Sequence, residues 1–105
     1  MAVINAQQKR RLRGAVLKLV YENHEAQGHR LDDVTLTAVL ERLQFDVYVN
    51  LVREILQDLE ERRYVSFYTE RNREKGSVAL RKIQILPGGR DLIEKTTTDA
   101  AVEVE

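Results

Sequence analysis

Residues 52–69 of the chain read VREILQDLEERRYVSFYT, and inside this stretch a helical pattern changes into a strand pattern. The helical part should begin near Asp46, which can cap it, and end at Arg62 or Arg63. From residue 64 to residue 69 aromatic and β-branched residues dominate, as is typical of a strand. The apolar residues of the helix recur at three- and four-residue steps and share one face: Tyr48, Val52, Ile55, Leu56 and Leu59.

Two further helices are expected before this stretch. The first spans residues 6 to 25 and the second starts at Asp32, Asp33 or Thr35, each of which can cap a helix. Between them Gly28 marks a stop, and residues 29–31 form a polar link that could pair as a minimal strand. The apolar positions that define the two helices are Leu12, Ala15, Val16, Leu19 and Val20 in the first and Leu36, Val39, Leu40 and Leu43 in the second.

A second strand and a short helix are expected after the stretch. Residues 77–85 alternate apolar and polar side chains toward their end and should pair with residues 64–69 as a hairpin. The segment 70–76 between them is charged and ends in a glycine, which predicts a solvated tip. Leu86-Pro87-Gly88-Gly89 ends the second strand, and a short helix should begin at Arg90.

Length and composition bound the function. The 105 residues suffice for one domain, which we place at residues 1–95, followed by a flexible acidic tail at 96–105. The chain has no cysteine, which excludes disulfides, iron–sulfur ligation and a thiol nucleophile and favours a reducing, cytoplasmic location. No stretch approaches the roughly 18 apolar residues of a membrane span, so no membrane partner is expected.

Charge is distributed unevenly although the formal net charge is zero. Residues 1–30 carry six basic and two acidic side chains, and residues 31–61 carry two basic and eight acidic ones. The sign then reverses twice more, with eight basic and two acidic side chains in 62–90 and one basic and five acidic in 91–105. A nucleic-acid partner must therefore be argued from where the charges lie and not from their sum.

Two parts of the sequence resemble bacterial and archaeal winged-helix regulators. VREILQDLEERRYV at residues 52–65 is similar to the junction between their recognition helix and first wing strand. IQILPGGRDLIE at residues 83–94 is similar to the strand exit of the PadR-like and MarR-like groups, with Leu86 in place of the usual threonine. The resemblance implies an α+β winged helix: a three-helix, helix-turn-helix core, a two-stranded β-hairpin wing and a short C-terminal helix.

The resemblance also implies a transcriptional or mobile-element regulator that places its third helix in the major groove of double-stranded DNA. Asn50, Arg53 and Gln57 lie off the apolar face of that helix, and their side chains match base edges. The amides of Asn50 and Gln57 can pair with adenine, and the guanidinium of Arg53 can pair with guanine. The same three positions also suit ordinary solvated residues of an amphipathic helix. The acidic Asp46 and Glu54 oppose contact with phosphate.

Two basic groups are expected to contact the DNA backbone. The first lies on the hairpin, and a charged tip that only keeps the hairpin soluble is the alternative reading. The second lies at the start of the first helix, where basic residues oppose the helix dipole, so a partner would explain them; a solvated basic face is the alternative. The expected contacts are Arg71, Arg73, Lys75, Arg81 and Lys82 on the hairpin, and Lys9, Arg10 and Arg13 on the helix.

Other chemistries find little support. His24 and His29 are five residues apart, which does not match the four-residue step that puts two metal ligands on one helix face. No serine has a nucleophile pattern and Gly88-Gly89 lacks the rest of a phosphate loop, so no enzyme activity, metal or cofactor is predicted. We assign packing rather than base stacking to Tyr48, Tyr64, Phe67 and Tyr68.

A second function of another class also fits the sequence. The acidic second and third helices could bind a basic protein, in which case the domain would be an interaction module that never touches DNA. Regulators of this shape commonly bind DNA as two-fold dimers. In so short a chain, the first helix or the tail from Thr96 would have to supply a homodimer interface.

Overall fold

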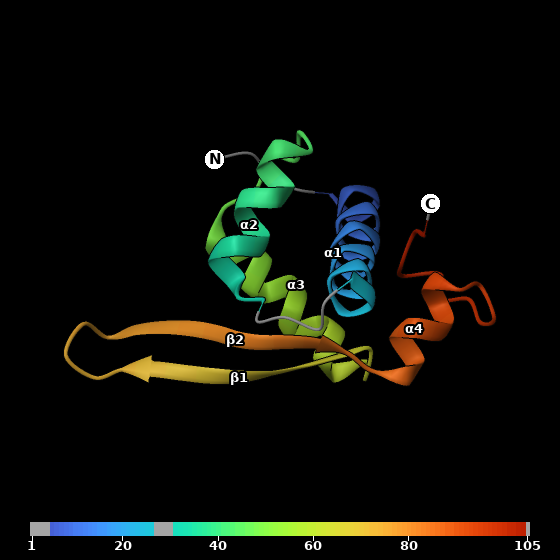
Figure 1. Cartoon of the computed structure of the whole chain (residues 1–105). Coiled ribbons are helices and arrows are strands. Elements are labelled where there is room, and N and C mark those ends of the chain that lie inside the picture. Colours follow the sequence, from blue (N-terminus) through green and yellow to red (C-terminus); the bar gives the residue numbers. More distant parts are fainter. Residues whose placement is uncertain (1–4, 27–30, 105) are drawn as a thin grey trace.

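The structure is a computed structural model that describes residues 5–26 and 31–104, and its elements follow the order expected from the sequence. The elements are α1 (Ala6–Ala26), α2 (Asp33–Arg42), α3 (Val49–Glu61), β1 (Val65–Asn72), β2 (Ser77–Ile85) and α4 (Pro87–Ile93). The two strands form one antiparallel sheet, so the fold is α+β. The hairpin extends sideways beneath α2 and α3, whereas α4 and the C-terminal residues lie on the other side of α1 (Figure 1).

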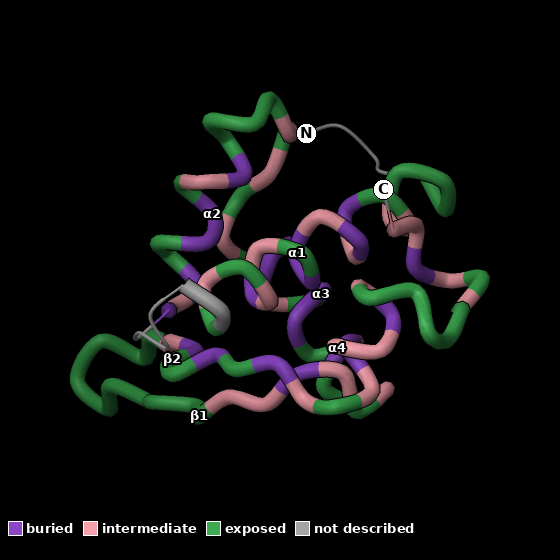
Figure 2. Tube along the Cα trace, turned by 45° about the vertical axis from the view of Figure 1, so that its right-hand side comes forward, coloured by how far each residue is buried: buried purple, intermediate pink, exposed green. Residues whose placement is uncertain are grey.

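The core lies where the three helices meet the root of the hairpin. The apolar face predicted for α3 is confirmed from Val52 onward, and Leu17 of α1, outside the predicted set, is fully buried as well. The side chains of β1 are exposed from Tyr68 onward, whereas β2 is packed further out, with Leu80 buried and Val78 half-buried against the core (Figure 2). The hairpin side chains that enter the core are Val65, Leu80, Ile83 and Ile85.

A main-chain hydrogen bond joins the hairpin to the end of the segment between α1 and α2. The amide of Ile83 in β2 donates to the carbonyl of Leu31 at 3.0 Å. Of the minimal strand that the sequence predicts at residues 29–31, only Leu31 is described, and it makes this hydrogen bond without belonging to a strand. Gly28 and the rest of this link lie outside the described residues.

Two helix starts differ from the prediction. The N-cap of α3 is Tyr48 and not Asp46, because α2 ends in a left-handed turn at Gln44 (φ 72°) with the Phe45 amide bonded to the Leu40 carbonyl at 3.0 Å. The chain then needs residues 46–48 to reach the start of α3. Helix α4 begins at Pro87 and not at Arg90, since proline is well suited to the first helical position.

The C-terminal segment is the largest departure from the sequence-based expectation. Residues 96–105 are expected to be flexible, yet Val102 is buried and the Glu103 amide donates to the Arg10 carbonyl of α1 at 3.1 Å. Gly14 permits this approach, because a Cβ at that position would lie 1.7 Å from the Glu103 carbonyl oxygen. The segment through residue 104 therefore packs as part of the domain.

Candidate nucleic-acid interface

The outward face of α3 carries two of the three predicted base contacts in accessible positions. Asn50 and Gln57 are both exposed, and the acidic Glu54 is exposed between them. The apolar face of the helix points into the core, so the amphipathic pattern determines which side chains reach solvent. This face offers amide donors and acceptors together with a negative charge.

Arg53, the third predicted base contact, is engaged inside the molecule. Its Nε donates to Oδ2 of Asp33 at 2.6 Å, and its Nη1 donates to Oδ1 of Asn50 at 3.2 Å. The side chain retains 24% of its accessible surface. Arg53 therefore acts first as a counter-ion, and base recognition would require it to leave or share that partner.

Asp33 is fully buried and joins three elements. Its Oδ2 accepts from the main-chain amide of Leu80 in β2 at 3.1 Å as well as from Arg53 in α3. Its Oδ1 accepts from the amide of Val34 at 2.8 Å, at the first turn of α2, where a negative charge is favoured. A buried carboxylate needs such partners, and here they connect α2, α3 and the hairpin. The sequence shows Asp32-Asp33 only as a capping pair, so this role was not predicted.

The hairpin tip holds cations that contact no acid. Arg71, Arg73 and Lys75 are exposed and form no ion pair with any part of the chain that the structure describes. Asn72 orders the turn between the strands, since its Oδ1 accepts from the amides of Glu74 and Lys75 at 3.0 and 3.2 Å. The tip is thus a defined turn with its positive charges directed to solvent.

The two cations predicted on the returning strand have partners. Arg81 Nε lies 2.9 Å from Glu70 Oε2, and its Nη1 lies 3.9 Å from Asp32 Oδ2. Lys82 places its ammonium 5.6 Å from the centre of the Tyr68 ring. The Glu70 carboxylate therefore forms its ion pair with Arg81, and the charge of the neighbouring Arg71 is not neutralised by Glu70.

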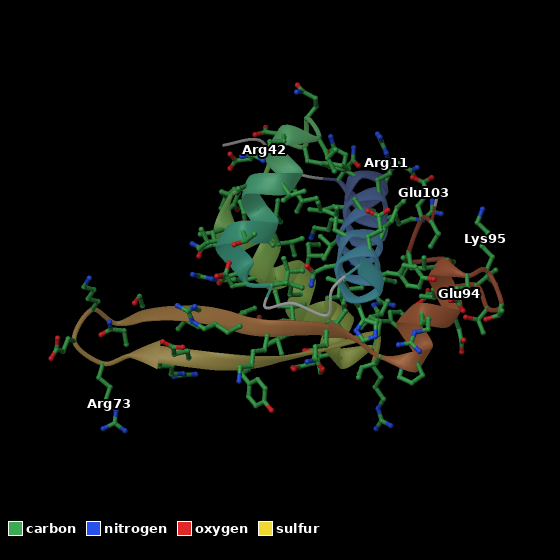
Figure 3. All side chains as sticks on the ribbon, in the orientation of Figure 1. Arg11, Arg42, Arg73, Glu94, Lys95 and Glu103 are labelled. Atoms are coloured by element: carbon green, nitrogen blue, oxygen red, sulfur yellow. The ribbon has the colours of Figure 1, made fainter. Side chains whose placement is uncertain are left out.

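The basic group at the start of α1 is separated from the hairpin. Arg13 bonds the Asp58 carboxylate and donates from Nη1 to the Ala101 carbonyl at 3.1 Å, and Arg10 donates to Gln7 at 3.1 Å. Figure 3 shows Arg11 next to Glu103 at the end of α1 that is far from the hairpin. Arg73, at the hairpin tip, lies on the opposite side of the molecule. The structure does not bring Lys9, Arg10 and Arg13 together with the hairpin cations.

The pKa values of three side chains are shifted by contacts at the ends of helices and strands. Burial, and then the hydrogen bond to Asp99, raises the pKa of Tyr64 to about 12. The same hydrogen bond from Tyr64 lowers the pKa of Asp99 below its usual range. The Thr35 amide, which donates to the Asp32 cap at 2.7 Å, lowers the pKa of Asp32. None of these groups lies on the exposed face of α3 or at the hairpin tip.

No protein-family model and no curated protein sequence matches the chain. Within residues 5–26 and 31–104, no helix is both long and apolar enough to cross a bilayer. The described residues also contain no group of three or more His, Asp or Glu side chains placed to hold a metal ion.

Proposed function

We propose that the chain is a winged-helix protein that binds double-stranded DNA, with the hairpin on the sugar–phosphate backbone and α3 in the major groove. The order of three helices and a hairpin supports this assignment, as does the Leu31–Ile83 hydrogen bond that fixes the hairpin next to the link between α1 and α2. A regulator of transcription or of a mobile element in the cytoplasm would have this architecture.

The observation that carries the proposal is the free positive charge of the hairpin tip. Arg71 lies at the end of β1, and Arg73 and Lys75 lie on the turn that projects away from the helical body. Glu70 is paired with Arg81, so the exposed Glu74 is the one acid of the tip set against these three cations. Phosphate contacts made by Lys and Arg release counterions and dominate non-specific DNA affinity. An exposed, ordered group of three cations is suited to that contact.

We assign base recognition to α3, with Asn50 and Gln57 as the base contacts and Arg53 no longer among them. Asn50 and Gln57 can each pair with adenine from exposed positions near the start and middle of the helix. Arg53 holds Asp33 and orients Asn50 through its Nη1, so we propose that it positions the reading face. The affinity of this face for bases then depends on amides, which do not attract phosphate.

The test compares two triple variants in fluorescence-anisotropy titrations with a blunt duplex. Arg71→Ala, Arg73→Ala and Lys75→Ala together should weaken binding to all sequences and lower the slope of log K against log salt by about one unit for each phosphate that is no longer neutralised. The matched control removes three exposed cations elsewhere, by Lys18→Ala, Arg42→Ala and Lys95→Ala. Figure 3 shows Arg42 and Lys95 away from the hairpin tip.

Equal loss of affinity in the two triple variants would show that only net charge matters and would remove the hairpin from the interface. Absence of binding by the unmodified chain at about 50 mM salt, where phosphate contacts are strongest, would overturn the proposal as a whole.

One observation favours a second function, a module that binds a basic protein. The exposed residues of α3 include Glu54, Glu60 and Glu61, and Arg53 contributes no free charge against them. Glu54→Gln separates the two functions, because it keeps the shape of the side chain and removes the charge. A helix in the major groove predicts several-fold tighter DNA binding by this variant. Unchanged DNA affinity together with weaker capture of a basic peptide would favour the protein-binding module.

A further inference from the structure

Tyr68 departs from the packing role that the sequence suggests for it. Its side chain is 69% exposed, the largest exposure among the large hydrophobic residues that the structure describes. It lies on the face of β1 that points away from the core: Val65 is buried on the other face, and Leu80, which pairs with Thr69 further along the hairpin, is buried as well. Core packing therefore does not account for an aromatic ring at this position.

A β-bulge brings Lys82 to the ring. Ser66 pairs with Gln84 and Tyr68 pairs with Arg81, so β2 has one residue more than β1 in this interval. Lys82 lies in the bulge with φ 54°, a left-handed conformation that is unfavourable for a residue other than glycine. Its ammonium lies 5.6 Å from the centre of the Tyr68 ring. The strained backbone is thus combined with an exposed pair of a cation and an aromatic ring.

We infer that Tyr68 and Lys82 form a stacking site for an unpaired nucleobase, so that the protein prefers DNA in which a duplex adjoins a single strand. The inference rests on the proposed DNA binding and specifies which form of DNA the hairpin takes. An exposed aromatic ring next to a positive charge combines the two elements by which proteins hold single-stranded nucleic acid, base stacking and attraction of the backbone.

A fully paired duplex offers no base that could stack on the Tyr68 ring. Bases inside a helix are stacked on one another and do not offer their faces, whereas an unpaired base does. Tyr68 and the tip cations lie on one hairpin, but Arg71, three residues along β1 and about 10 Å away at the usual rise of a strand, points to the opposite face of the strand because side chains alternate. A single strand whose base stacks on Tyr68 therefore has Lys82, and not Arg71, as the cation that the structure places beside it.

The first test measures affinity for a blunt duplex and for the same duplex with a single-stranded thymine tail of either polarity. The unmodified chain should bind a tailed duplex more tightly, and Tyr68→Ala should weaken that binding by about tenfold while leaving the blunt duplex unaffected. Tyr68→Phe retains the ring and should retain the preference. Thr69→Ala, at the exposed neighbouring position, is the matched control and should change neither affinity.

Lys82→Gly separates a binding role from a structural one. Glycine adopts positive φ without steric cost, so the variant should keep the bulge and unfold at a temperature no lower than the unmodified chain. It removes the cation, so the preference for the tailed duplex should fall. Retention of the full preference in this variant would remove Lys82 from the site.

Fluorescence reports stacking directly, because the chain contains no tryptophan. Tyr68→Trp introduces a single tryptophan, whose emission should be quenched by the tailed duplex and not by the blunt one. Equal quenching by both, or an equal effect of Tyr68→Ala on both, would overturn the inference and leave the proposed duplex binding intact. Failure to bind either DNA would instead overturn the proposed function and the inference with it.

Discussion

The arginines of the helical body and the cations of the hairpin tip differ in what their charges contact. In the body, Arg13 bonds Asp58 and Arg53 bonds Asp33, and each of these pairs connects elements that are distant in sequence. At the tip, Arg71, Arg73 and Lys75 have no acidic partner among the described residues. The basic side chains of the body therefore hold elements of the fold together, whereas those of the tip remain free to bind a partner.

The glycines of the two regions show the same difference. A Cβ at Gly14 would overlap the main chain of Glu103, whereas one at Gly76 would meet no atom within 4 Å. The body is closely packed even where the C-terminal segment crosses α1, and the tip is open on all sides. A substitution in the body should thus change stability, and a substitution at the tip should change binding.

The largest expected effect is the loss of the buried carboxylate. Asp33→Ala leaves Arg53 without its counter-ion and the Leu80 amide without its acceptor, and should lower the free energy of unfolding by about 3 kcal/mol. Urea denaturation measures this loss. The neighbouring Asp32→Ala removes a helix cap and should cost only about 1 kcal/mol. Equal losses in the two variants would contradict the distinct role given to Asp33.

The next effect concerns the packing of the C-terminal segment. Gly14→Ala must displace the Glu103 main chain and should cost about 2 kcal/mol, as overpacking does elsewhere. Gly76→Ala meets no atom and bears only the strain of φ 63°, about 1 kcal/mol. Amide hydrogen exchange at Glu103 should accelerate in the first variant alone. Slow exchange there in both variants would show that the segment does not depend on Gly14.

A smaller effect depends on pH. Tyr64→Phe removes the hydrogen bond to Asp99 and should cost about 1 kcal/mol at neutral pH. The raised Tyr64 pKa means that the folded chain retains a proton that the unfolded chain releases, so this stabilisation is full below pH 10 and is lost between pH 10 and about 12. The lowered Asp99 pKa means that its contribution is present above pH 3.8 and disappears as the pH falls further.

Urea titrations across this range provide the measurement. The unmodified chain should lose more stability than Tyr64→Phe between pH 10 and 12, and the two curves should converge in strong acid. Parallel curves throughout would show that the Tyr64–Asp99 bond does not exist in solution.

The smallest expected effect on stability belongs to the tip. The variant that combines Arg71→Ala, Arg73→Ala and Lys75→Ala should unfold within about 0.5 kcal/mol of the unmodified chain, because surface residues without partners contribute little to stability. Urea denaturation checks this together with the DNA titrations. A loss as large as that of Asp33→Ala would mean that the tip cations hold the fold, and the comparison between the two regions would fail.

Local pattern accounts for most of the secondary structure. The spacing of Val52, Ile55, Leu56 and Leu59 predicts which face of α3 is buried, and the alternation in residues 77–85 predicts β2, because both patterns depend only on nearby residues. The predicted start of α3, by contrast, is wrong. It depends on how α2 ends, at Gln44, and this left-handed turn has no glycine to reveal it.

The parts of the candidate site that depend on tertiary contacts could not be predicted. Asp33 and Arg53 are twenty residues apart, and nothing local distinguishes a buried ion pair from a cap and a solvated arginine. The C-terminal segment has only Val102 and Val104 as apolar anchors, so its packing depends on the small surface at Gly14. The exposure of Tyr68 depends on which face of β1 is turned away from the core, and composition does not reveal this.

The turn of the hairpin takes no part in core packing, and this has a consequence for engineering. Val65, Leu80, Ile83 and Ile85 hold the strands in register, and no side chain between Arg71 and Ser77 enters the core. Residues 72–77 can therefore be exchanged for another turn, or lengthened by an inserted peptide, at little thermodynamic cost. The domain would then serve as a scaffold on which a library of loops is displayed at a fixed distance from the helices.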